Sequence, residues 1–228
     1  MVNSIVVPSL LACNRSDLLP ALRSLLSARA FPRFHFDRMD GQFVPNSGLS
    51  HSLLRNLRSA LAREGLPVPP FEAHLMVRRP SRFWRKFADA GAELVSFHLE
   101  SDDRAAVLAE EVTRSGLSCG LCINPPTPFD RCVPFLEHFS FLVLMGVHPG
   151  LCGQRLLPGV AEKIHRAADY RRRSGLSYAI VVDGGVCAEN APQLVAAGAD
   201  FLIAGKAIFG GENVQASYGE LLQAIATR

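Results

Sequence analysis

The sequence predicts an α/β fold, a single (β/α)8 TIM barrel that spans residues 1–228 as one domain. Eight short apolar segments alternate with eight longer amphipathic segments, a pattern typical of parallel strands joined by helices. The chain has 228 residues, slightly fewer than the ~250 of a usual barrel of this class. The first apolar segment continues into Pro8-Ser-Leu-Leu11. It lacks the glycine-rich turn of a dinucleotide-binding doubly wound sheet, which is the alternative fold.

Each predicted strand is a short apolar run. In a barrel of this class the functional groups lie at the carboxyl ends of the strands, so these ends are where candidate site residues are sought. In chain order the predicted strands are Ile5–Pro8, Arg33–Asp37, Phe71–Met76, Leu94–His98, Leu117–Ile123, Phe141–Val147, Ser177–Val182 and Asp200–Ala204.

The predicted helices fill the intervals between the strands. They are Ser16–Arg29, Ser50–Glu64, Ser81–Ala90, Asp102–Arg114, Pro128–Glu137, Leu157–Arg173, Ala188–Ala197 and Glu212–Ala226. Four begin at a residue type that favours the helix N-cap, namely Ser16, Ser50, Ser81 and Asp102. Five precede a glycine, the residue that favours the position after a helix; these glycines are Gly65, Gly91, Gly116, Gly175 and Gly198.

The composition excludes several classes of protein. Hydrophobic residues make up 48% of the chain and charged residues 20%, which is typical of a globular domain with a full core. The net charge is +3, and the longest basic block, Arg171–Arg173, falls at a predicted helix end, where cations are favourable. We therefore expect no nucleic-acid partner.

No uncharged apolar run approaches the ~20 residues that span a membrane, so we expect no membrane partner. The start, Met1-Val-Asn-Ser4, lacks the basic and apolar regions of a signal peptide, and the six cysteines are scattered along the chain. These features predict reduced thiols and a cytoplasmic location. Cys119 and Cys122 have the spacing of a redox or zinc motif. However, residues three apart on a strand point to opposite faces, so we interpret both as buried packing residues.

Polar residues occur at strand ends where a barrel core would be apolar. By alternation, Phe34 and Phe36 face the helices, so His35, Asp37 and Met39 face the barrel axis. A buried histidine and a buried carboxylate are costly unless they are paired. This strand is therefore a candidate for the functional site.

Two further strands add residues of matching orientation. His74 and Met76 end the third strand, and Asp183 ends the seventh. Singly, a strand-end histidine is more often a core residue and an aspartate a helix cap. Together, two histidines and two aspartates at the barrel mouth predict a site for one divalent metal ion, Zn, Fe, Mn or Co. His98 ends the fourth strand and is a weaker candidate to line the mouth.

Glycine-rich segments follow the last three predicted strands. Such segments bind phosphate through backbone amides, and in barrels this is the usual phosphate position. The candidate residues are Gly150, Leu151, Cys152 and Gly153, then Gly184 and Gly185, then Gly205 and Lys206.

The chain resembles the ribulose-phosphate 3-epimerase family from end to end. The matching segments are Pro8-Ser-Leu-Leu11, His35-Phe-Asp-Arg-Met-Asp-Gly41, Phe43-Val-Pro-Asn46, His74-Leu-Met-Val77, Asn124-Pro125, Pro149-Gly150 with Gly153-Gln154, Val182-Asp-Gly-Gly-Val186 and Ala197-Gly-Ala-Asp200. A set of this length in this order is highly specific to the family.

The resemblance implies an isomerase of the pentose phosphate pathway that converts D-ribulose 5-phosphate to D-xylulose 5-phosphate through an enediolate. It implies that one cation, with zinc favoured, is bound by His35, Asp37, His74 and Asp183, and that the two aspartates are the acid/base pair. The substrate would contact Ser9, His74, the wall of Met39, Met76 and Met145, and the three glycine segments named above. The protein would be a homo-oligomer, a dimer or a hexamer.

The chain departs from the family pattern near the expected sugar and phosphate positions, at Gln42, Ser47–Ser50, Leu151-Cys152 and Lys206. A 3-epimerase of another ketose phosphate, such as D-allulose 6-phosphate, therefore remains an alternative. An inactive sugar-phosphate-binding protein is a second alternative. Metal-assisted decarboxylases and aldol-type synthases are disfavoured because the Asp37-Arg-Met-Asp40 segment has no lysine.

Overall fold

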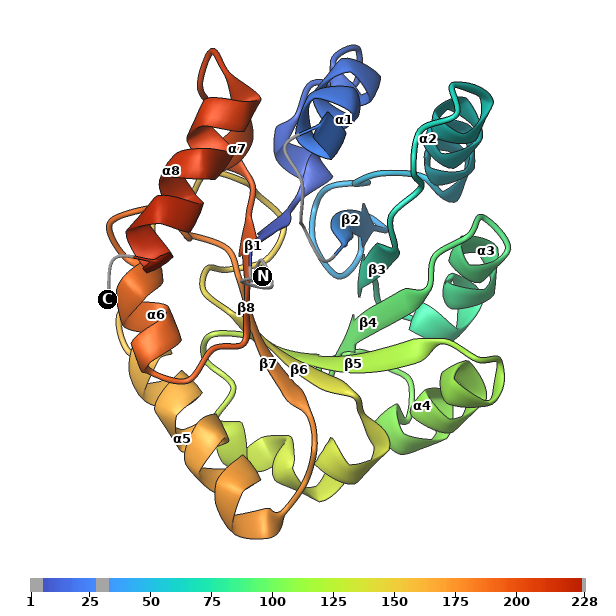
Figure 1. Cartoon of the computed structure of the whole chain (residues 1–228). Coiled ribbons are helices and arrows are strands. Elements are labelled where there is room, and N and C mark those ends of the chain that lie inside the picture. The colour runs from blue at the N-terminus through green and yellow to red at the C-terminus, as the bar shows by residue number, and fades with distance from the viewer. Residues whose placement is uncertain (1–5, 28–32, 227–228) are drawn as a thin grey trace.

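A computed structural model describes residues 6–27 and 33–226 of the chain, and all structural statements concern these residues. Eight parallel strands form one sheet in the order β1-β8-β7-β6-β5-β4-β3-β2, and the helices surround it (Figure 1). This confirms the predicted (β/α)8 barrel. The strands are β1 (Val6–Pro8), β2 (Phe34–Met39), β3 (Phe71–Met76), β4 (Leu94–His98), β5 (Ser118–Ile123), β6 (Phe141–Met145), β7 (Ala179–Asp183) and β8 (Phe201–Ala204).

The outer layer contains eight α-helices and four short 3₁₀ helices within the described residues. The α-helices are α1 (Leu18–Ser27), α2 (His51–Arg63), α3 (Trp84–Ala88), α4 (Ala105–Arg114), α5 (Val160–Ser174), α6 (Ala191–Ala196), α7 (Lys206–Phe209) and α8 (Val214–Ala226). The 3₁₀ helices are η1 (Leu10–Ala12), η2 (Pro80–Arg82), η3 (Phe129–Arg131) and η4 (Val133–His138). Two predicted boundaries, Ile5 and Arg29, lie outside the described residues.

The strands are buried on both faces, as expected for a barrel covered by helices. Phe34 and Phe36 of β2 belong to the large core between sheet and helices. A smaller cluster fills the barrel itself and includes Phe141 and Met145. Gly120 makes room for it, because a Cβ atom there would lie 2.1 Å from the Phe141 ring. The alternation deduced from the sequence is therefore confirmed for β2.

Among the residues described, the strands of the barrel are paired by ladders of hydrogen bonds at every junction except the one between β1 and β2. β1 pairs with β8 over Val6–Pro8, and β2 pairs with β3 along its full length. Between β1 and β2, the described part of the chain shows a single isolated parallel bridge, from Ser9 to His35. The closing contact of the barrel thus lies directly beside the candidate site residues.

One predicted helix is wrong in type. The segment 128–137 forms two 3₁₀ helices, η3 and η4, and not one α-helix. Pro134 stands in the first turn of η4, and proline cannot donate the backbone hydrogen bond that an α-helix passing through this position requires. Short 3₁₀ turns are the usual solution for such connectors.

The predicted helix ends were more accurate than the predicted starts. The glycines expected after helices, such as Gly65 and Gly175, adopt positive φ values. Ser50 caps α2 through a hydrogen bond from Leu53 N to its Oγ. Ser81 lies within η2, and Asp102 precedes α4 by too much to cap it, because α4 begins after Arg104.

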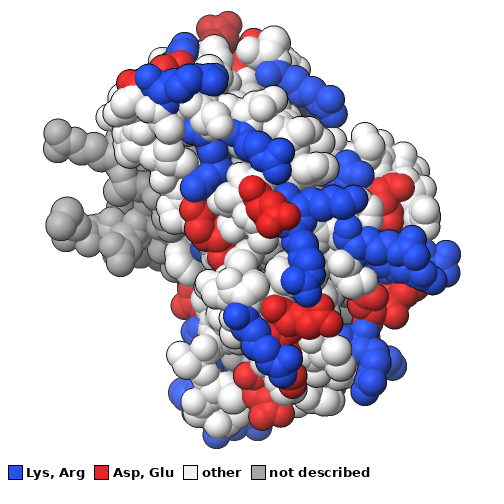
Figure 2. All heavy atoms as spheres, turned by 90° about the vertical axis from the view of Figure 1, so that its right-hand side faces the viewer, with Lys and Arg blue, Asp and Glu red and all other residues white. Residues whose placement is uncertain are grey.

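The face formed by α2, α3 and α4 carries both signs of charge (Figure 2). Arginines on this side pair with nearby acids, as in Arg58–Glu93 and Arg78–Asp102. The blue and red groups in Figure 2 are accordingly interleaved. No helix among the described residues is long and apolar enough to cross a membrane.

Candidate active site

Four predicted residues from β2, β3 and β7 converge at one position in the barrel. His35 and Asp37 come from β2, His74 from β3 and Asp183 from β7. One donor atom from each lies within 4.8 Å of the others, and all four side chains are buried. The four therefore form a compact donor set of two imidazoles and two carboxylates.

The contacts within this set point to one central position. His35 Nε2 lies 3.1 Å from Asp37 Oδ1 and 3.5 Å from Asp183 Oδ2. His74 Nδ1 lies 3.1 Å from Asp183 Oδ2 and 3.4 Å from Asp37 Oδ1. The two ring nitrogens are themselves 3.2 Å apart. Each imidazole thus turns one nitrogen toward both carboxylates.

The electrostatics of the set favour positive charge at its centre. Burial alone would lower the pKa of His35 and His74, but it is raised well above the usual value of histidine, for His35 by Asp37 and Asp183 and for His74 by Cys122 and the same two aspartates. Burial would likewise raise the pKa of Asp37 and Asp183, but the two imidazoles lower it. A divalent cation satisfies the same carboxylates and displaces protons from the imidazoles. The donor set therefore fits a metal ion.

Ser9 joins this set from the end of β1. Its Oγ donates a hydrogen bond of 2.8 Å to Asp37 Oδ2. Asp37 Oδ1 remains directed to the histidines, so Ser9 fixes the rotation of the carboxylate. The residue is held in turn by its backbone bond to Ala204 O.

A cavity of about 840 Å³ opens above the donor set. Asp37 and Asp183 line its floor, whereas His35 and His74 lie fully buried behind them. The remaining predicted site residues all line the same cavity: Ser9, Met39, Met76, Met145, Gly150, Leu151, Cys152, Gly153, Gly184, Gly185, Gly205 and Lys206.

The three methionines are buried on the site side of the barrel. Met39 and Met76 pack with Val44 at the mouth, and Met145 belongs to the cluster inside the barrel. Flexible thioether side chains fill irregular apolar surfaces without needing a polar partner. They give the cavity an apolar wall next to two carboxylates.

The glycine segments bring backbone close to the cavity. Gly185 has a φ of +73°, and a Cβ atom there would lie 2.5 Å from Leu156 N. Gly153 has a φ of +79°, and a Cβ atom there would lie 3.0 Å from Lys206 Cδ. The Lys206 side chain therefore lies against the loop after β6. Lys206 and Arg155 are the two basic residues that line the cavity beside this loop.

The loop after β6 is held by a side chain of its own and by one from the segment after β2. Gln154 Nε2 donates to His148 O at 2.7 Å and to Leu151 O at 2.9 Å. Asn46, from the segment after β2, donates to Gly150 O. These bonds position the phosphate-loop candidates over the cavity, with Leu151 itself 66% exposed.

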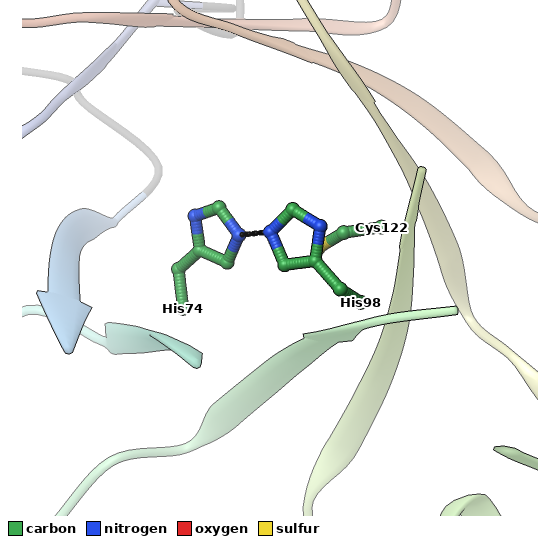
Figure 3. A group of neighbouring side chains, drawn as sticks. All are labelled: His74, His98 and Cys122. Atoms are coloured by element: carbon green, nitrogen blue, oxygen red, sulfur yellow. Dashed lines mark hydrogen bonds between the residues drawn. The ribbon is translucent and has the colours of Figure 1, made fainter. Parts of the chain in front are cut away.

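A second group of side chains lies behind His74 (Figure 3). His74 Nε2 is 2.9 Å from His98 Nε2, and Cys122 of β5 lies beside them. The prediction that His98 lines the mouth is wrong, since it is fully buried beneath Phe43, with ring centroids 4.8 Å apart. Burial lowers the pKa of His98 and raises that of the Cys122 thiol.

The interpretation of the two strand cysteines as buried is confirmed. Cys119 belongs to the outer core and Cys122 to the barrel interior, as opposite faces require. Cys122 differs from a plain packing residue, because its sulfur lies within reach of the two imidazole rings of His74 and His98.

A buried ion pair lies beneath His35. Arg33 Nε donates to Glu72 Oε2 at 2.7 Å, and Ser96 Oγ donates to Glu72 Oε1 at 2.9 Å. The same Oε1 lies 3.5 Å from His35 Nδ1. The Arg33 guanidinium is 4.7 Å from the centroid of the Phe201 ring. Glu72 thus faces the side of His35 opposite to the cavity.

Sequence comparison decides the family. Residues 5–209 match the family described as the ribulose-phosphate 3 epimerase family. The chain belongs to the ribulose-phosphate 3-epimerase family. It is an enzyme of the isomerase class that acts on carbohydrates.

Two relatives illustrate the similarity within the ribulose-phosphate 3-epimerase family. The ribulose-phosphate 3-epimerase of Treponema pallidum is 35% identical over 206 residues, which cover 90% of this chain and 91% of the relative. That of Escherichia coli K12 is 32% identical over 209 residues, covering 92% and 90%. The similarity therefore extends over nearly the whole of both chains.

Comparison with solved structures supports the barrel fold but gives no information about the reaction. The 3-hexulose-6-phosphate synthase of Salmonella typhimurium has a TM-score of 0.71 to this epimerase-family chain at 12% identity, covering 97% of this chain and 98% of the other. At such low identity the likeness concerns the fold and not the reaction.

Sequence reasoning did not find Glu72, Ser96 and Arg33 behind the site of this family member. One signal was present: Glu72 is an acid within an apolar strand and has the same parity as His74. By alternation it faces the barrel axis, where a charged group needs a partner. The identity of that partner, Arg33 at the edge of another strand, depends on strand pairing.

Proposed function

We propose that this protein is a metal-dependent ketose-phosphate 3-epimerase that interconverts D-ribulose 5-phosphate and D-xylulose 5-phosphate in the pentose phosphate pathway. The observation that carries the proposal is the relation between Asp37 and Asp183. The two carboxylates come from strands separated by β8 and β1, yet both lie within 3.5 Å of the same two ring nitrogens. Two acids that converge in this way can address one carbon from two sides.

The metal site of the proposal consists of His35, Asp37, His74 and Asp183. A mixed set of neutral imidazoles and carboxylates suits Zn, Fe, Mn or Co, and zinc is preferred on this donor set. When bound, such a cation supplies Lewis-acid stabilisation of negative charge on the substrate oxygens.

Asp37 and Asp183 move the proton at C3. The hydrogen on C3 of a ketose is acidified by the neighbouring C2 carbonyl, so its removal leaves an enediolate. One carboxylate takes this proton from one face, and the other delivers a proton to the opposite face, which inverts the centre. In the reverse direction the two aspartates exchange roles. Ser9, through its bond to Asp37 Oδ2, keeps the carboxylate oriented for this transfer.

The apolar wall of Met39, Met76 and Met145 keeps water from the reacting carbon. All three line the cavity whose floor is formed by the two aspartates. The thioether groups present no hydrogen-bond donor that would reprotonate the enediolate from the wrong side.

The phosphate group is placed at the other end of the cavity. The glycine segments there and the Lys206 ammonium provide backbone donors and a positive charge. The residues assigned to phosphate are Gly150, Leu151, Cys152, Gly153, Gly184, Gly185, Gly205 and Lys206.

The test is isotope incorporation in heavy water across a panel of ketose phosphates that includes D-ribulose 5-phosphate and D-allulose 6-phosphate. We expect the product to carry one deuterium at C3, while unreacted substrate remains protiated at early conversion. That combination identifies transfer by two separate acids. Epimerised product without deuterium would contradict the proposed proton transfer. A faster reaction of D-allulose 6-phosphate than of D-ribulose 5-phosphate would show that D-allulose 6-phosphate is the preferred substrate.

A further inference from the structure

His74 uses its two ring nitrogens for different neighbours. Nδ1 faces the carboxylates, at 3.1 Å from Asp183 Oδ2. Nε2 lies 2.9 Å from Nε2 of His98, and the planes of the two rings are inclined by only 16°, with centroids 5.0 Å apart. Figure 3 shows the two rings joined edge to edge by this contact.

This geometry determines where the protons lie once a cation is bound. A nitrogen that binds a metal must present a lone pair, so His74 Nδ1 carries no proton and Nε2 carries one. His74 Nε2 then donates to His98 Nε2, which accepts. His98 keeps its own proton on Nδ1, the nitrogen that faces Glu100 Oε2 at 3.5 Å.

The far end of this chain of contacts is anchored on the protein backbone. Glu100 Oε1 accepts a bond of 2.9 Å from Asn124 N and another from Thr127 Oγ1. These residues belong to the turn after β5, which Lys163 holds through three backbone carbonyls. The orientation of Glu100 is therefore fixed independently of the metal site.

The same residues admit another interpretation, a second metal site formed by His74, His98 and Cys122. That site would need His74 to bind cations through both nitrogens at once and lose both protons. All three side chains are completely buried, and none lines the cavity. The hydrogen-bonded arrangement needs neither an extra ion nor a route for it.

We propose that His98 is a positioning residue for His74: it accepts the Nε2 proton, so that Nδ1 is free and aimed at the cation, and Glu100 orients His98 in turn. This inference rests on the proposed metal-dependent function. Outer partners of this kind typically change metal affinity about 10–100-fold.

The test compares zinc binding by the full-length protein and three variants, using competition with a chromophoric chelator and counting zinc per chain. His98→Leu removes the acceptor, and we expect zinc affinity to fall about 10–100-fold. His98→Gln supplies a carbonyl to accept from His74 and an amide to donate to Glu100, so affinity should be largely restored. Cys122→Ala, the matched control on the same imidazole, should bind one zinc with wild-type affinity.

A spectroscopic readout separates positioning from simple loss of packing. In ¹⁵N-labelled zinc-bound wild type, imidazole spectra should show His74 protonated at Nε2 and metal-bound at Nδ1. His98→Leu should lose this single tautomer. If His98→Leu does not fold, the wild-type spectrum and the zinc affinity of His98→Gln still test whether His98 positions His74.

The outcomes distinguish the inference from the function on which it rests. Wild type that binds no zinc would overturn both. One bound zinc with unchanged affinity in His98→Leu, or with His74 protonated at Nδ1, would overturn the positioning role alone. Two bound zinc ions, reduced to one in Cys122→Ala, would replace it with the second metal site.

Discussion

Arg33 and Glu72 form an ion pair inside the barrel, with Nε and Oε2 2.7 Å apart and side-chain exposures of 7% and 0%. Glu72 also accepts from Ser96 and faces His35. Burial would raise the pKa of Glu72, but Arg33 and His35 lower it. The carboxylate is therefore charged, and its charge depends on its partners.

Breaking this pair from one side should destabilise the protein strongly. Arg33→Met leaves a buried carboxylate uncompensated, a loss of about 3–5 kcal/mol in the free energy of unfolding. Urea unfolding measures it. The matched control is Arg23→Met, which removes an arginine from the exposed pair with Glu64 and should change stability little. Equal effects of the two substitutions would contradict the importance of the buried pair.

Replacing either acid should separate proton exchange from epimerisation. Asp37→Asn and Asp183→Asn should each reduce epimerisation by at least about 10³-fold, because one face of C3 loses its acid/base group. The remaining aspartate should still exchange the C3 hydrogen of one epimer with heavy water without inversion. NMR of the recovered substrate detects this exchange. Metal content must be measured in parallel, and near-normal epimerisation by either metal-loaded variant refutes the assigned roles.

Removal of the cation should lower both activity and thermal stability. A ligand that binds the native state stabilises it by mass action, so chelation should reduce the unfolding temperature. Zn, Mn, Fe or Co should restore activity. His74→Ala should lose metal-dependent stabilisation, whereas His165→Ala, at an exposed histidine of α5, should retain it. Full activity after verified metal removal would contradict a metal-dependent reaction.

Lys206 should affect substrate binding more than chemistry. A hydrogen bond to a charged group contributes about 1.5–3 kcal/mol, so Lys206→Met should raise KM for the sugar phosphate about tenfold or more, with kcat little changed. Steady-state kinetics with Lys206→Arg tests whether charge suffices. Lys86→Met, at an exposed lysine of α3, is the control. Unchanged KM in Lys206→Met would remove this residue from the phosphate site.

Tyr178 should make stability decrease at alkaline pH. Its hydroxyl donates to Ala167 O at 2.8 Å, and burial raises its pKa to about 12. The unfolded chain ionises at a pKa of about 10. Because the folded pKa is the higher one, this stabilisation is complete below pH ~10 and is lost as pH rises toward 12. Tyr178→Phe should be about 1 kcal/mol less stable at pH 7, with a smaller difference at pH 11. A difference independent of pH would contradict the shift.

Much of the fold was predictable because local signals agree with the tertiary structure. The strands Phe71–Met76 and Leu94–His98 have the predicted bounds; the first begins directly after Pro70 and the second directly after Glu93. Helix ends at Gly65 and Gly175 followed from the positive φ that glycine tolerates. The interruption at Pro134 was visible in the sequence, yet the choice of two 3₁₀ helices depends on packing.

The candidate site was predictable to the extent that strand parity determines direction. His35, Asp37, His74 and Asp183 lie on strands of one barrel with side chains facing its axis, so their convergence followed from the fold. The contacts behind them did not. That His98 reaches His74, and that Glu72 reaches Arg33, depends on the register between neighbouring strands and on side-chain rotamers. A sequence gives no direct measure of either.

The incomplete seam between β1 and β2 gives the proposed metal ion a second, structural effect. Seven junctions of the barrel are extended ladders, whereas in the described residues this one is the bridge between Ser9 and His35. Backbone amides at such a junction are the ones that open most readily. The donors on β2 and β3 lie on one side of the seam, and Asp183 on β7 lies on the other. An ion held by all of them would join the two sides of this junction and so stabilise the closed barrel.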